Sequence, residues 1–185
     1  METKDKIYNA AIAEINKKGY SNVSIEDITT AANVAKGTFY THFESKEAVV
    51  LYTAMQADKV YQRAYEQVRH LAFLPMVTQF VRLSYLENEK RGKEIIKAMV
   101  SNYFSIPDYN FYNQDRYLLR YLNVIVEAGK AQGALDGRLP TSQYVNTLLS
   151  AIIGMEVLWC FDEQGLSLAD MMEEAVHTAA RGMMK

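Results

Sequence analysis

The sequence contains very little cysteine: Cys160 is the only one among 185 residues. One cysteine excludes an internal disulfide and any metal site built from several cysteines, so nothing in the composition argues for an oxidising compartment. The chain also has only three histidines, and they are not spaced as the ligands of a metal ion would be. We therefore expect no metal site and no cofactor.

Long apolar runs are missing as well. The most apolar stretch, AIIGMEVLWCF, is interrupted by Glu156 and is too short to span a bilayer. The opening residues, METKDK, are too polar for a secretory signal. Because the apolar fraction of 49% is nevertheless ample for a buried core, we expect a globular cytoplasmic protein without a membrane partner.

Catalytic motifs are equally scarce. The sequence has no glycine-rich phosphate loop and no G-x-S-x-G motif, and His70 and His177 stand alone. An enzyme is the main alternative from another class, but no residue is a candidate for catalysis. The net charge of −2 is unlike that of a basic nucleic-acid-binding domain, and residues 1–47 are not basic overall. Any DNA binding must then rest on a local patch and on backbone amides, which predicts a modest salt dependence.

The most informative stretch is SIEDITTAANVAKGTFYTHFESK, residues 24–46. Ser24 stands three residues before Asp27, which is the spacing of a capping box. The apolar residues that follow recur at three- and four-residue steps and predict a short amphipathic helix from Ile25. Asn33 ends this helix, because asparagine tolerates the left-handed conformation that commonly closes one.

A second short helix is predicted over roughly residues 36–43, with Phe39 and Phe43 as its buried edge. Its other side chains are small, polar or aromatic: Lys36, Gly37, Thr38, Tyr40, Thr41 and His42. Such a helix can enter the major groove of double-stranded DNA, where glycine lets the backbone come close, and Lys46 adds a cation beyond it. From the pattern alone, two ordinary packed helices or a helical interaction module without DNA remain alternatives.

Residues 7–50 resemble the amino-terminal domain of TetR-family transcriptional repressors nearly position by position. The shared features are the alanine pair at 10–11, KKGY at 17–20, S-x-x-D-I at 24–28, AA-x-V at 31–34 and KGTFYTHFESKE at 36–47. The last string is highly specific, because ordinary amphipathicity does not demand glycine, aromatic residues, histidine and lysine at these offsets. The resemblance implies a helix-turn-helix that binds operator DNA.

The same resemblance assigns roles within that motif. It makes Thr38 and Tyr40 operator contacts on the recognition helix, Lys36 and Gly37 its leading end, and His42 and Lys46 phosphate contacts. Two positions depart from the family pattern: Asn33 stands where glycine is usual, and Ala35 replaces a frequent capping residue. Because a lost cap costs roughly 0.5 to 2 kcal/mol, we expect the recognition helix to fray without DNA.

Helical periodicity continues along the rest of the chain, so we expect an all-α protein. Further helices are predicted at residues 3–18, 45–69, 75–89, 92–104, 114–131, 141–159 and 167–183. Thr141 or Ser142 is expected to cap the helix at 141–159, and Ser167, three residues before Asp170, is expected to cap the last one. We divide the chain into a helix-turn-helix domain at residues 1–46 and a helical effector-binding and dimerisation domain at residues 47–185. The uninterrupted helix that starts at Ser45 is the natural lever between a ligand site and the DNA site.

Tyrosine is abundant, with thirteen in the chain, and six of them lie between Tyr85 and Tyr121. Aromatic side chains with polar tips suit a pocket for a flat or apolar small molecule. The candidate pocket residues are Tyr85, Tyr103, Phe104, Tyr117, Tyr121 and Trp159. Plain core packing is the alternative for each of them.

The last two predicted helices have more apolar surface than one face can bury. They resemble, more loosely, the carboxy-terminal helix pair through which TetR-family proteins dimerise as a four-helix bundle. We therefore expect a homodimer whose interface contains Leu148, Ile152, Met155, Trp159, Met172, Val176 and Ala179. Residues and resemblance together predict a ligand-responsive repressor, which a small apolar or aromatic effector releases from a palindromic operator.

Overall fold

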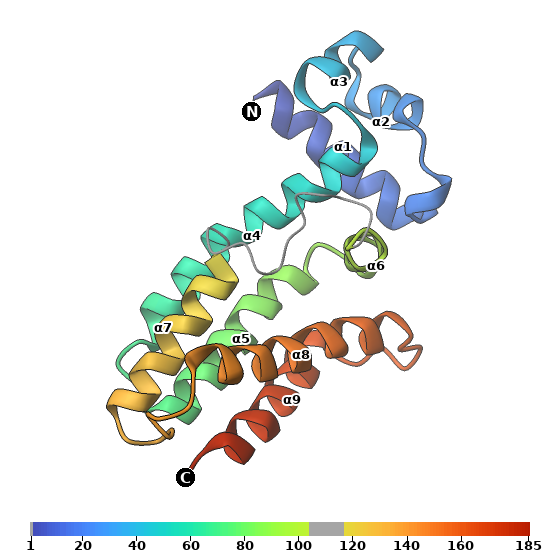
Figure 1. The fold of residues 1–185 in the computed structure, drawn as a ribbon. Coiled ribbons are helices and arrows are strands. Elements are labelled where there is room, and N and C mark those ends of the chain that lie inside the picture. Colours follow the sequence, from blue (N-terminus) through green and yellow to red (C-terminus); the bar gives the residue numbers. More distant parts are fainter. Residues whose placement is uncertain (1, 104–116) are drawn as a thin grey trace. The chain divides into compact units, whose positions relative to one another are not determined.

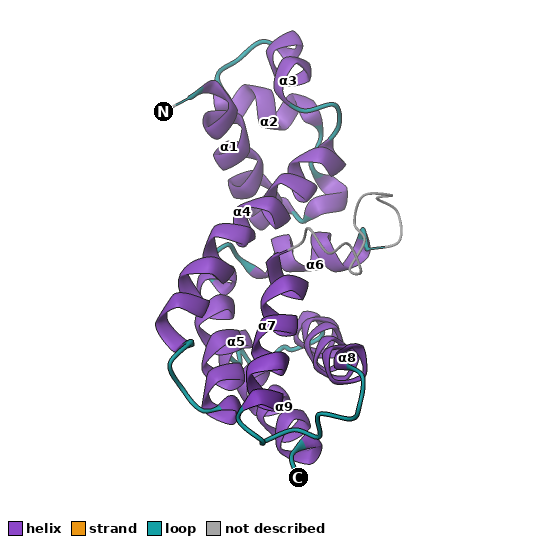
Figure 2. Cartoon of the chain, turned by 60° about the vertical axis from the view of Figure 1, so that its left-hand side comes forward, coloured by secondary structure: helices purple, strands orange, loops and turns teal. Residues whose placement is uncertain are grey.

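Helices supply the regular structure in the computed structural model, which describes residues 2–103 and 117–185. Over these residues the chain forms nine α-helices and one 3-10 helix and has no β-strand (Figures 1 and 2). The expected all-α class is therefore confirmed. In the same described part, no helix combines the length and apolar character needed to cross a membrane, and no cluster of His, Cys, Asp or Glu could hold a metal ion.

The chain folds as two compact units. The first contains Met1–Gln56 and Arg91–Tyr109, and the second contains Ala57–Lys90 and Asn110–Lys185. Helix α4 (Lys46–Val68) supplies residues to both. The functional division at residue 46 made from the sequence is a different kind of boundary, and it stays a proposal.

The first unit is built around α1 (Thr3–Lys18), α2 (Ile25–Ala32) and α3 (Lys36–His42), with a 3-10 turn, η1 (Tyr20–Asn22), between α1 and α2. Their apolar faces share one core with the start of α4 and with α6 (Lys93–Ser101). The buried members of this core are Ile7, Ala11, Ile15, Val23, Ile28, Ala32, Phe39, Phe43, Val49 and Ile95. One edge of α3 is thus committed to the interior, which leaves its other face outside.

Local capping explains where the two short helices begin and end. Ser24 and Asp27 form the predicted capping box, in which each side chain accepts a hydrogen bond from the other residue's backbone amide. Helix α2 ends at Asn33, which has the left-handed conformation with φ of 51°. Helix α3 begins after Ala35, which provides no side-chain cap. The structure confirms these three expectations.

The turn before α6 is fitted closely to α1 and α4. Asn16 donates a 2.6 Å hydrogen bond to the backbone carbonyl of Arg91. The guanidinium of Arg91 donates to the Thr53 carbonyl at 3.0 Å and to the Tyr8 hydroxyl at 3.2 Å. Gly92 has φ of +98°, and a Cβ there would lie 2.2 Å from Asn16 Oδ1. Only glycine fits at this position, so α6 is tied to the first unit.

The second unit contains α5 (Phe73–Glu89), α7 (Tyr117–Ala131), α8 (Thr141–Cys160) and α9 (Leu168–Met183), together with the second part of α4. Helix α9 packs against α5 and α8, and α7 packs against α5 and α8. The core of the unit includes Phe73, Met76, Phe80, Tyr85, Leu122, Ile125, Leu148, Ile152, Met172 and Val176. Residues from both terminal helices therefore lie inside a single protomer.

Polar contacts join α5 to the start of α9. The carboxylate of Glu89 on α5 accepts hydrogen bonds from Ser167 Oγ at 2.9 Å and from the Ala169 amide at 3.2 Å. The guanidinium of Arg82 bridges Asp170 at 2.9 Å and Glu173 at 2.7 Å. Ser167 itself caps α9, as its spacing from Asp170 predicted.

One predicted cap is wrong. Helix α8 begins at Thr141 with Pro140 as its N-cap residue, so neither Thr141 nor Ser142 caps it. The proline ring fixes the φ of Pro140, where the extended chain turns into the helix. The predicted helix at 92–104 is too long: α6 covers Lys93–Ser101, Gly92 is its N-cap residue, and residues 102–103 form a turn. The predicted helix at 114–131 runs as α7 from Tyr117. Residues 104 and 114–116 lie outside the described part of the chain.

Candidate nucleic-acid interface

Helix α3 presents a polar face to solvent. Lys36, Gly37, Tyr40 and Thr41 are exposed, whereas Phe39 is buried in the core of the first unit. The side chain of Tyr40 is 49% exposed, and its ring meets the ring of Phe39 edge to face with 5.6 Å between centroids. Tyr40 is therefore held by packing on one side and remains available to another molecule on the other.

Two further candidates on α3 are less open, and the exposed Thr41 makes a hydrogen bond within the helix. Thr38 and His42 are half-buried. The hydroxyl of Thr41 donates a 3.1 Å hydrogen bond to the carbonyl of Gly37, one turn earlier in the helix. The structure thus brings the six predicted α3 residues together on one short helix. Four of them are exposed and two are half-buried, a difference that the sequence pattern did not predict.

Gly37 is not required by the protein itself. A Cβ built at this position has no atom within 4 Å, and the residue does not have a positive φ. Glycine inside a helix is less favourable than alanine by up to about 1 kcal/mol. A residue that lowers helix stability without serving the fold is well suited to a surface that another backbone must approach.

Lys46, the first residue of α4, has a different environment from the other predicted DNA contacts. It is half-buried, and its Nζ donates to the carbonyls of Tyr20 at 2.7 Å and Val23 at 2.8 Å. The ammonium also lies 4.2 Å from the centroid of the Tyr20 ring. The phosphate contact assigned to Lys46 by resemblance stays a prediction, because its side chain already has partners within the first unit.

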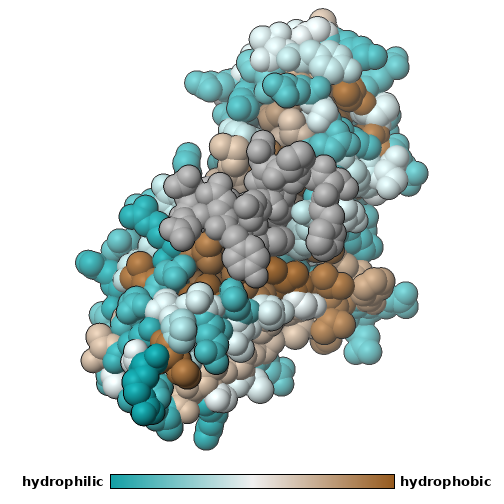
Figure 3. Space-filling view, viewed as in Figure 1, coloured by the Kyte–Doolittle hydropathy of each residue, from teal (hydrophilic) through white to brown (hydrophobic). Residues whose placement is uncertain are grey.

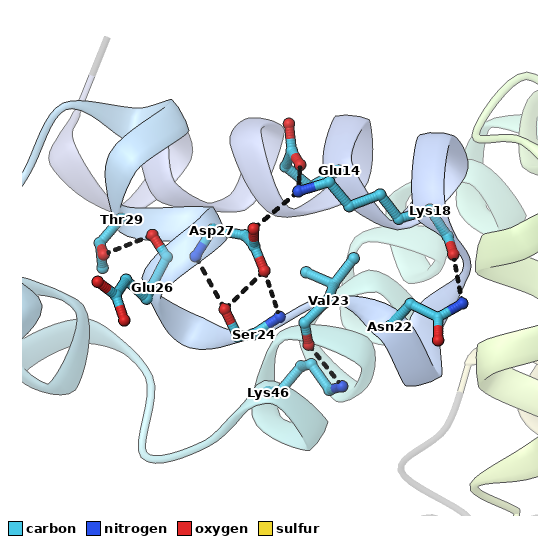
Figure 4. A network of polar contacts seen from close by, with 9 residues as sticks. All are labelled: Glu14, Lys18, Asn22, Val23, Ser24, Glu26, Asp27, Thr29 and Lys46. Atoms are coloured by element: carbon cyan, nitrogen blue, oxygen red, sulfur yellow. Dashed lines mark hydrogen bonds and ion pairs between the residues drawn. The ribbon is translucent and has the colours of Figure 1, made fainter.

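An ion-pair network fixes α1 against the start of α2 (Figure 4). Lys18 Nζ lies 2.7 Å from Asp27 Oδ1 and 2.7 Å from Glu14 Oε2. The hydrogen bond from Lys18, followed by that from Ser24, holds the pKa of Asp27 well below its usual range. The same contact with Asp27 raises the pKa of Lys18. Asp27 thus combines helix capping with an interhelical contact.

Tyr20 and Glu47 are functional-site candidates that the sequence analysis missed. The Tyr20 hydroxyl donates a 2.8 Å hydrogen bond to Glu47 Oε1. Burial, and then this bond to Glu47, raise the pKa of Tyr20 above its ordinary value. Tyr20 lies in the matched string KKGY, but no local spacing shows that it meets α4.

The predicted effector residues do not form one described cluster. Tyr121 stacks on Tyr65 with 4.8 Å between ring centroids. The ring centroids of Phe80 and Tyr117 each lie 6.1 Å from that of Tyr121. We call these four residues the aromatic cluster. Burial raises the pKa of Tyr121. Phe104, also a predicted pocket residue, lies outside the described residues.

Three other predicted pocket residues have core positions. Tyr85 is 1% exposed and donates a 2.6 Å hydrogen bond to Glu156, and Trp159 is 5% exposed and donates from its indole to the Leu166 carbonyl at 2.8 Å. Tyr103 is buried and belongs to the first unit. For these residues the structure shows core packing, which was the alternative left open by the sequence.

The predicted dimer residues require a correction. Leu148, Ile152, Trp159, Met172 and Val176 are 0–5% exposed inside one protomer. They cannot present that surface to a partner, because intramolecular packing between α8, α9 and α5 already uses it. Met155 and Ala179 are half-buried and keep some free area.

A different apolar stripe is exposed on α8. Gly154, Leu158 and Phe161 follow at helical spacing, and Leu158 and Phe161 are 59% and 78% exposed. Leu166, in the connection to α9, is 48% exposed. Figure 3 shows apolar surface in the region where α8 runs in the same view of Figure 1.

Comparison with known proteins places the helix-turn-helix in a family. Residues 7–53 match the family model described as bacterial regulatory proteins, tetR family. The HTH-type transcriptional repressor DhaR of Mycobacterium sp. (strain GP1) is 62% identical over 32 residues, which are 17% of this chain and only 16% of that repressor's length. IcaR of Staphylococcus aureus, a negative transcriptional regulator of the biofilm operon icaADBC, is 24% identical over 165 residues, or 89% of this chain and 73% of IcaR.

The similarity in fold to solved structures extends beyond the residues that match the family model. FadR of Thermus thermophilus, a TetR-family transcriptional repressor solved in complex with lauroyl-CoA, superposes with a TM-score of 0.73 at 20% identity, covering 98% of this chain and 95% of FadR. The family model thus covers α1 to the start of α4, and the shared fold extends over the rest. Residues 7–53 thus match the TetR family of bacterial regulatory proteins, and the fold of the chain is similar to that of a TetR-family repressor.

Proposed function

We propose that this protein is a dimeric transcriptional repressor that binds double-stranded operator DNA through α3 and responds to a small effector. The exposed face of α3 carries this proposal: Lys36, Gly37, Tyr40 and Thr41 are open to solvent on a helix whose opposite edge is buried. The family and the matched relatives are DNA-binding regulators rather than enzymes. Such a protein works where the bacterial DNA lies, so we place it in the cytoplasm.

The α3 face supports base and phosphate contacts by different means. Tyr40 offers a hydroxyl and a ring, Lys36 offers a charge at the start of the helix, and Gly37 offers close backbone approach. The unpaired amides in the first turn of α3 also favour a phosphate, because no side chain caps them. We infer that DNA binding stabilises the start of α3, where no side chain caps the helix.

Dimerisation is proposed through the exposed stripe of α8. Leu158 and Phe161 would meet their symmetry equivalents, and Gly154 would permit close approach of the two helices. Two-fold symmetry then places two copies of α3 on half-sites of a palindromic operator about one helical turn apart, roughly 34 to 36 Å. The division into a DNA-binding part at residues 1–46 and an effector and dimerisation part at residues 47–185 belongs to the same proposal.

The effector is proposed to be a small apolar or aromatic molecule that binds at the aromatic cluster of the second unit. Stacked and tilted rings provide apolar area, and tyrosine hydroxyls can orient a ligand. The acyl-CoA bound by Thermus thermophilus FadR, a protein of similar fold, makes a long-chain acyl-CoA a reasonable first probe.

The test of DNA binding is selection from random duplexes, followed by fluorescence anisotropy on the enriched duplex. Wild type should enrich a palindrome, and Tyr40→Ala should bind it more weakly while keeping helix content and melting temperature. Lys17→Ala is the matched control, since Lys17 is exposed on α1 away from α3. Failure of wild type to enrich any sequence would refute the proposal and favour an interaction module without DNA.

A further inference from the structure

Lys46 holds the end of η1 with its ammonium. Two of its donors are used by the carbonyls of Tyr20 and Val23, at 2.7 Å and 2.8 Å, and the charge lies over the Tyr20 ring at 4.2 Å (Figure 4 shows the bond to Val23). These carbonyls lie at the beginning and the cap of a 3-10 turn. The Tyr20 carbonyl also accepts a 3.4 Å hydrogen bond from the Val23 amide. A carbonyl oxygen has two lone pairs, so it can still accept a charge-assisted hydrogen bond from an ammonium.

The neighbouring residue strengthens the same contact. Glu47 accepts a 2.8 Å hydrogen bond from the Tyr20 hydroxyl. Two consecutive residues at the start of α4 therefore hold Tyr20: Lys46 contacts its carbonyl and ring, and Glu47 accepts the hydrogen bond from its hydroxyl. The first turn of α4 is fixed to the connection between α1 and α2 by charge-assisted bonds.

This contact lies close in the chain to both flanks of the segment that contains α2 and α3. Val23 is 3% exposed in the core and directly precedes Ser24, which caps α2. At the other end, α3 ends at His42 and only residues 43–45 separate it from Lys46. Phe39 and Phe43 pack one edge of α3 into the core. Because no side chain caps the start of this short helix, the contacts that hold its two flanks also affect its orientation.

We propose that Lys46 acts in DNA binding as a positioning residue, which sets the orientation of α3 by bridging α4 to η1, rather than as a contact that neutralises a phosphate. This inference rests on the proposed function. Lys36 provides the contrast: it is exposed on α3 and makes no ion pair or side-chain hydrogen bond within residues 2–103 and 117–185. Two lysines near the same helix thus act by different physical means.

The salt dependence of binding separates the two roles. Each phosphate contact that is lost lowers the slope of log affinity against log salt by about 0.9. We compare Lys46→Gln with Lys36→Gln in the full-length dimer, using the duplex enriched by selection and temperatures well below each melting midpoint. Glutamine removes the charge in both variants, but at position 46 its amide can still reach toward one carbonyl, which favours a folded protein.

The expected results differ for the two variants. Lys36→Gln should reduce the slope by about 0.9 with an unchanged melting temperature. Lys46→Gln should bind roughly tenfold more weakly at every salt concentration with the wild-type slope, and it should melt at a lower temperature. Lys46→Arg, which keeps two donors for the carbonyls, should recover most of the lost affinity.

Three outcomes would overturn the proposal. A slope reduced by about one unit in Lys46→Gln would make Lys46 a phosphate contact. Unchanged affinity with a lower melting temperature would make its role purely structural, and no change in either would leave the bridge without effect. If wild type binds no duplex specifically, the proposed function fails, which is a distinct result because it appears before any variant is compared.

Discussion

The ammonium of Lys18, at the end of α1, lies 2.7 Å from Oδ1 of Asp27, in the first turn of α2. Asp27 Oδ2 meanwhile accepts hydrogen bonds from the Ser24 amide at 2.8 Å and the Ser24 hydroxyl at 2.6 Å. A single carboxylate therefore joins the capping of α2 to the packing of α2 on α1. The stability of the helix-turn-helix therefore depends on whether the Asp27 carboxylate is ionised.

Acid should weaken this junction in a predictable range. The folded-state pKa of Asp27 is depressed from its ordinary value of 3.8, so its contribution is present above that value and is lost as the pH falls toward the depressed one. We expect the difference in melting temperature between wild type and Asp27→Asn to shrink as the pH falls from about 7 to about 2. Circular dichroism melts would measure it. Glu26→Gln, at the exposed neighbouring position, should show no such trend, and equal behaviour of both variants would argue against the assignment.

Alkali acts on the other partner. The pKa of Lys18 is raised above its ordinary value of 10.5, so the stabilisation is complete below that value and disappears as the pH rises through the folded-state pKa. A plateau of stability between the two limits is the expected profile for this pair.

Gly37→Ala should separate stability from DNA binding. Because a Cβ at this position meets no atom of the protein, the substitution should stabilise α3, by up to about 1 kcal/mol. The same methyl group should weaken operator binding by keeping the backbone away from the DNA. Urea denaturation and fluorescence anisotropy would give the two effects. Gly182→Ala, on α9 with equally open surroundings, is the matched control, and an affinity for DNA equal to that of wild type in Gly37→Ala would show that backbone approach does not matter here.

The exposed stripe of α8 gives a prediction about assembly. Leu158→Glu with Phe161→Glu should convert a dimer to a folded monomer, since both side chains are more than half exposed in the protomer and charge cannot be buried there cheaply. Analytical ultracentrifugation would report the mass. Val124→Glu changes a similarly apolar but less exposed residue on α7 and should leave the dimer intact. A double variant that stays dimeric would place the interface elsewhere.

Effector binding can be tested at the aromatic cluster. Lauroyl-CoA, the first probe, is titrated against the protein–duplex complex. It should reduce DNA affinity by about 5- to 150-fold if coupling has the usual size of 1 to 3 kcal/mol. Operator should then reduce ligand affinity by the same factor. Tyr121→Ala should weaken ligand binding, because Tyr121 contacts three other rings, whereas Tyr144→Phe, outside the cluster, should not. Ligand affinity that is the same with and without operator would disprove coupling.

The parts of the fold that local chemistry determines were predictable from the sequence. Ser24 with Asp27, Asn33, and Ser167 with Asp170 each set a helix end through contacts between residues close in the chain. Pro140 shows the limit of that approach: Thr141 and Ser142 are residue types that often cap a helix, but the proline before them occupies the cap position.

The contacts of the candidate site were less predictable. Lys46 meets carbonyls more than twenty positions away, and no periodicity encodes such a contact. Leu148 and Met172 show a second limit: an apolar helical face has the same sequence pattern whether it packs within a protomer or against a partner. Only the packing of α8 and α9 on each other and on α5 and α7 shows that these side chains are already buried.

That packing also predicts how the second unit opens. The Ala169 amide, in the first turn of α9, has its partner on another helix, the carboxylate of Glu89, and Arg82 forms ion pairs with Asp170 and Glu173. Separating α9 from α5 would therefore expose an unpaired amide and an apolar face at the same moment. We expect the amide protons of these two helices to exchange with solvent in one cooperative event, with a common free energy of opening, although a long stretch of chain separates them.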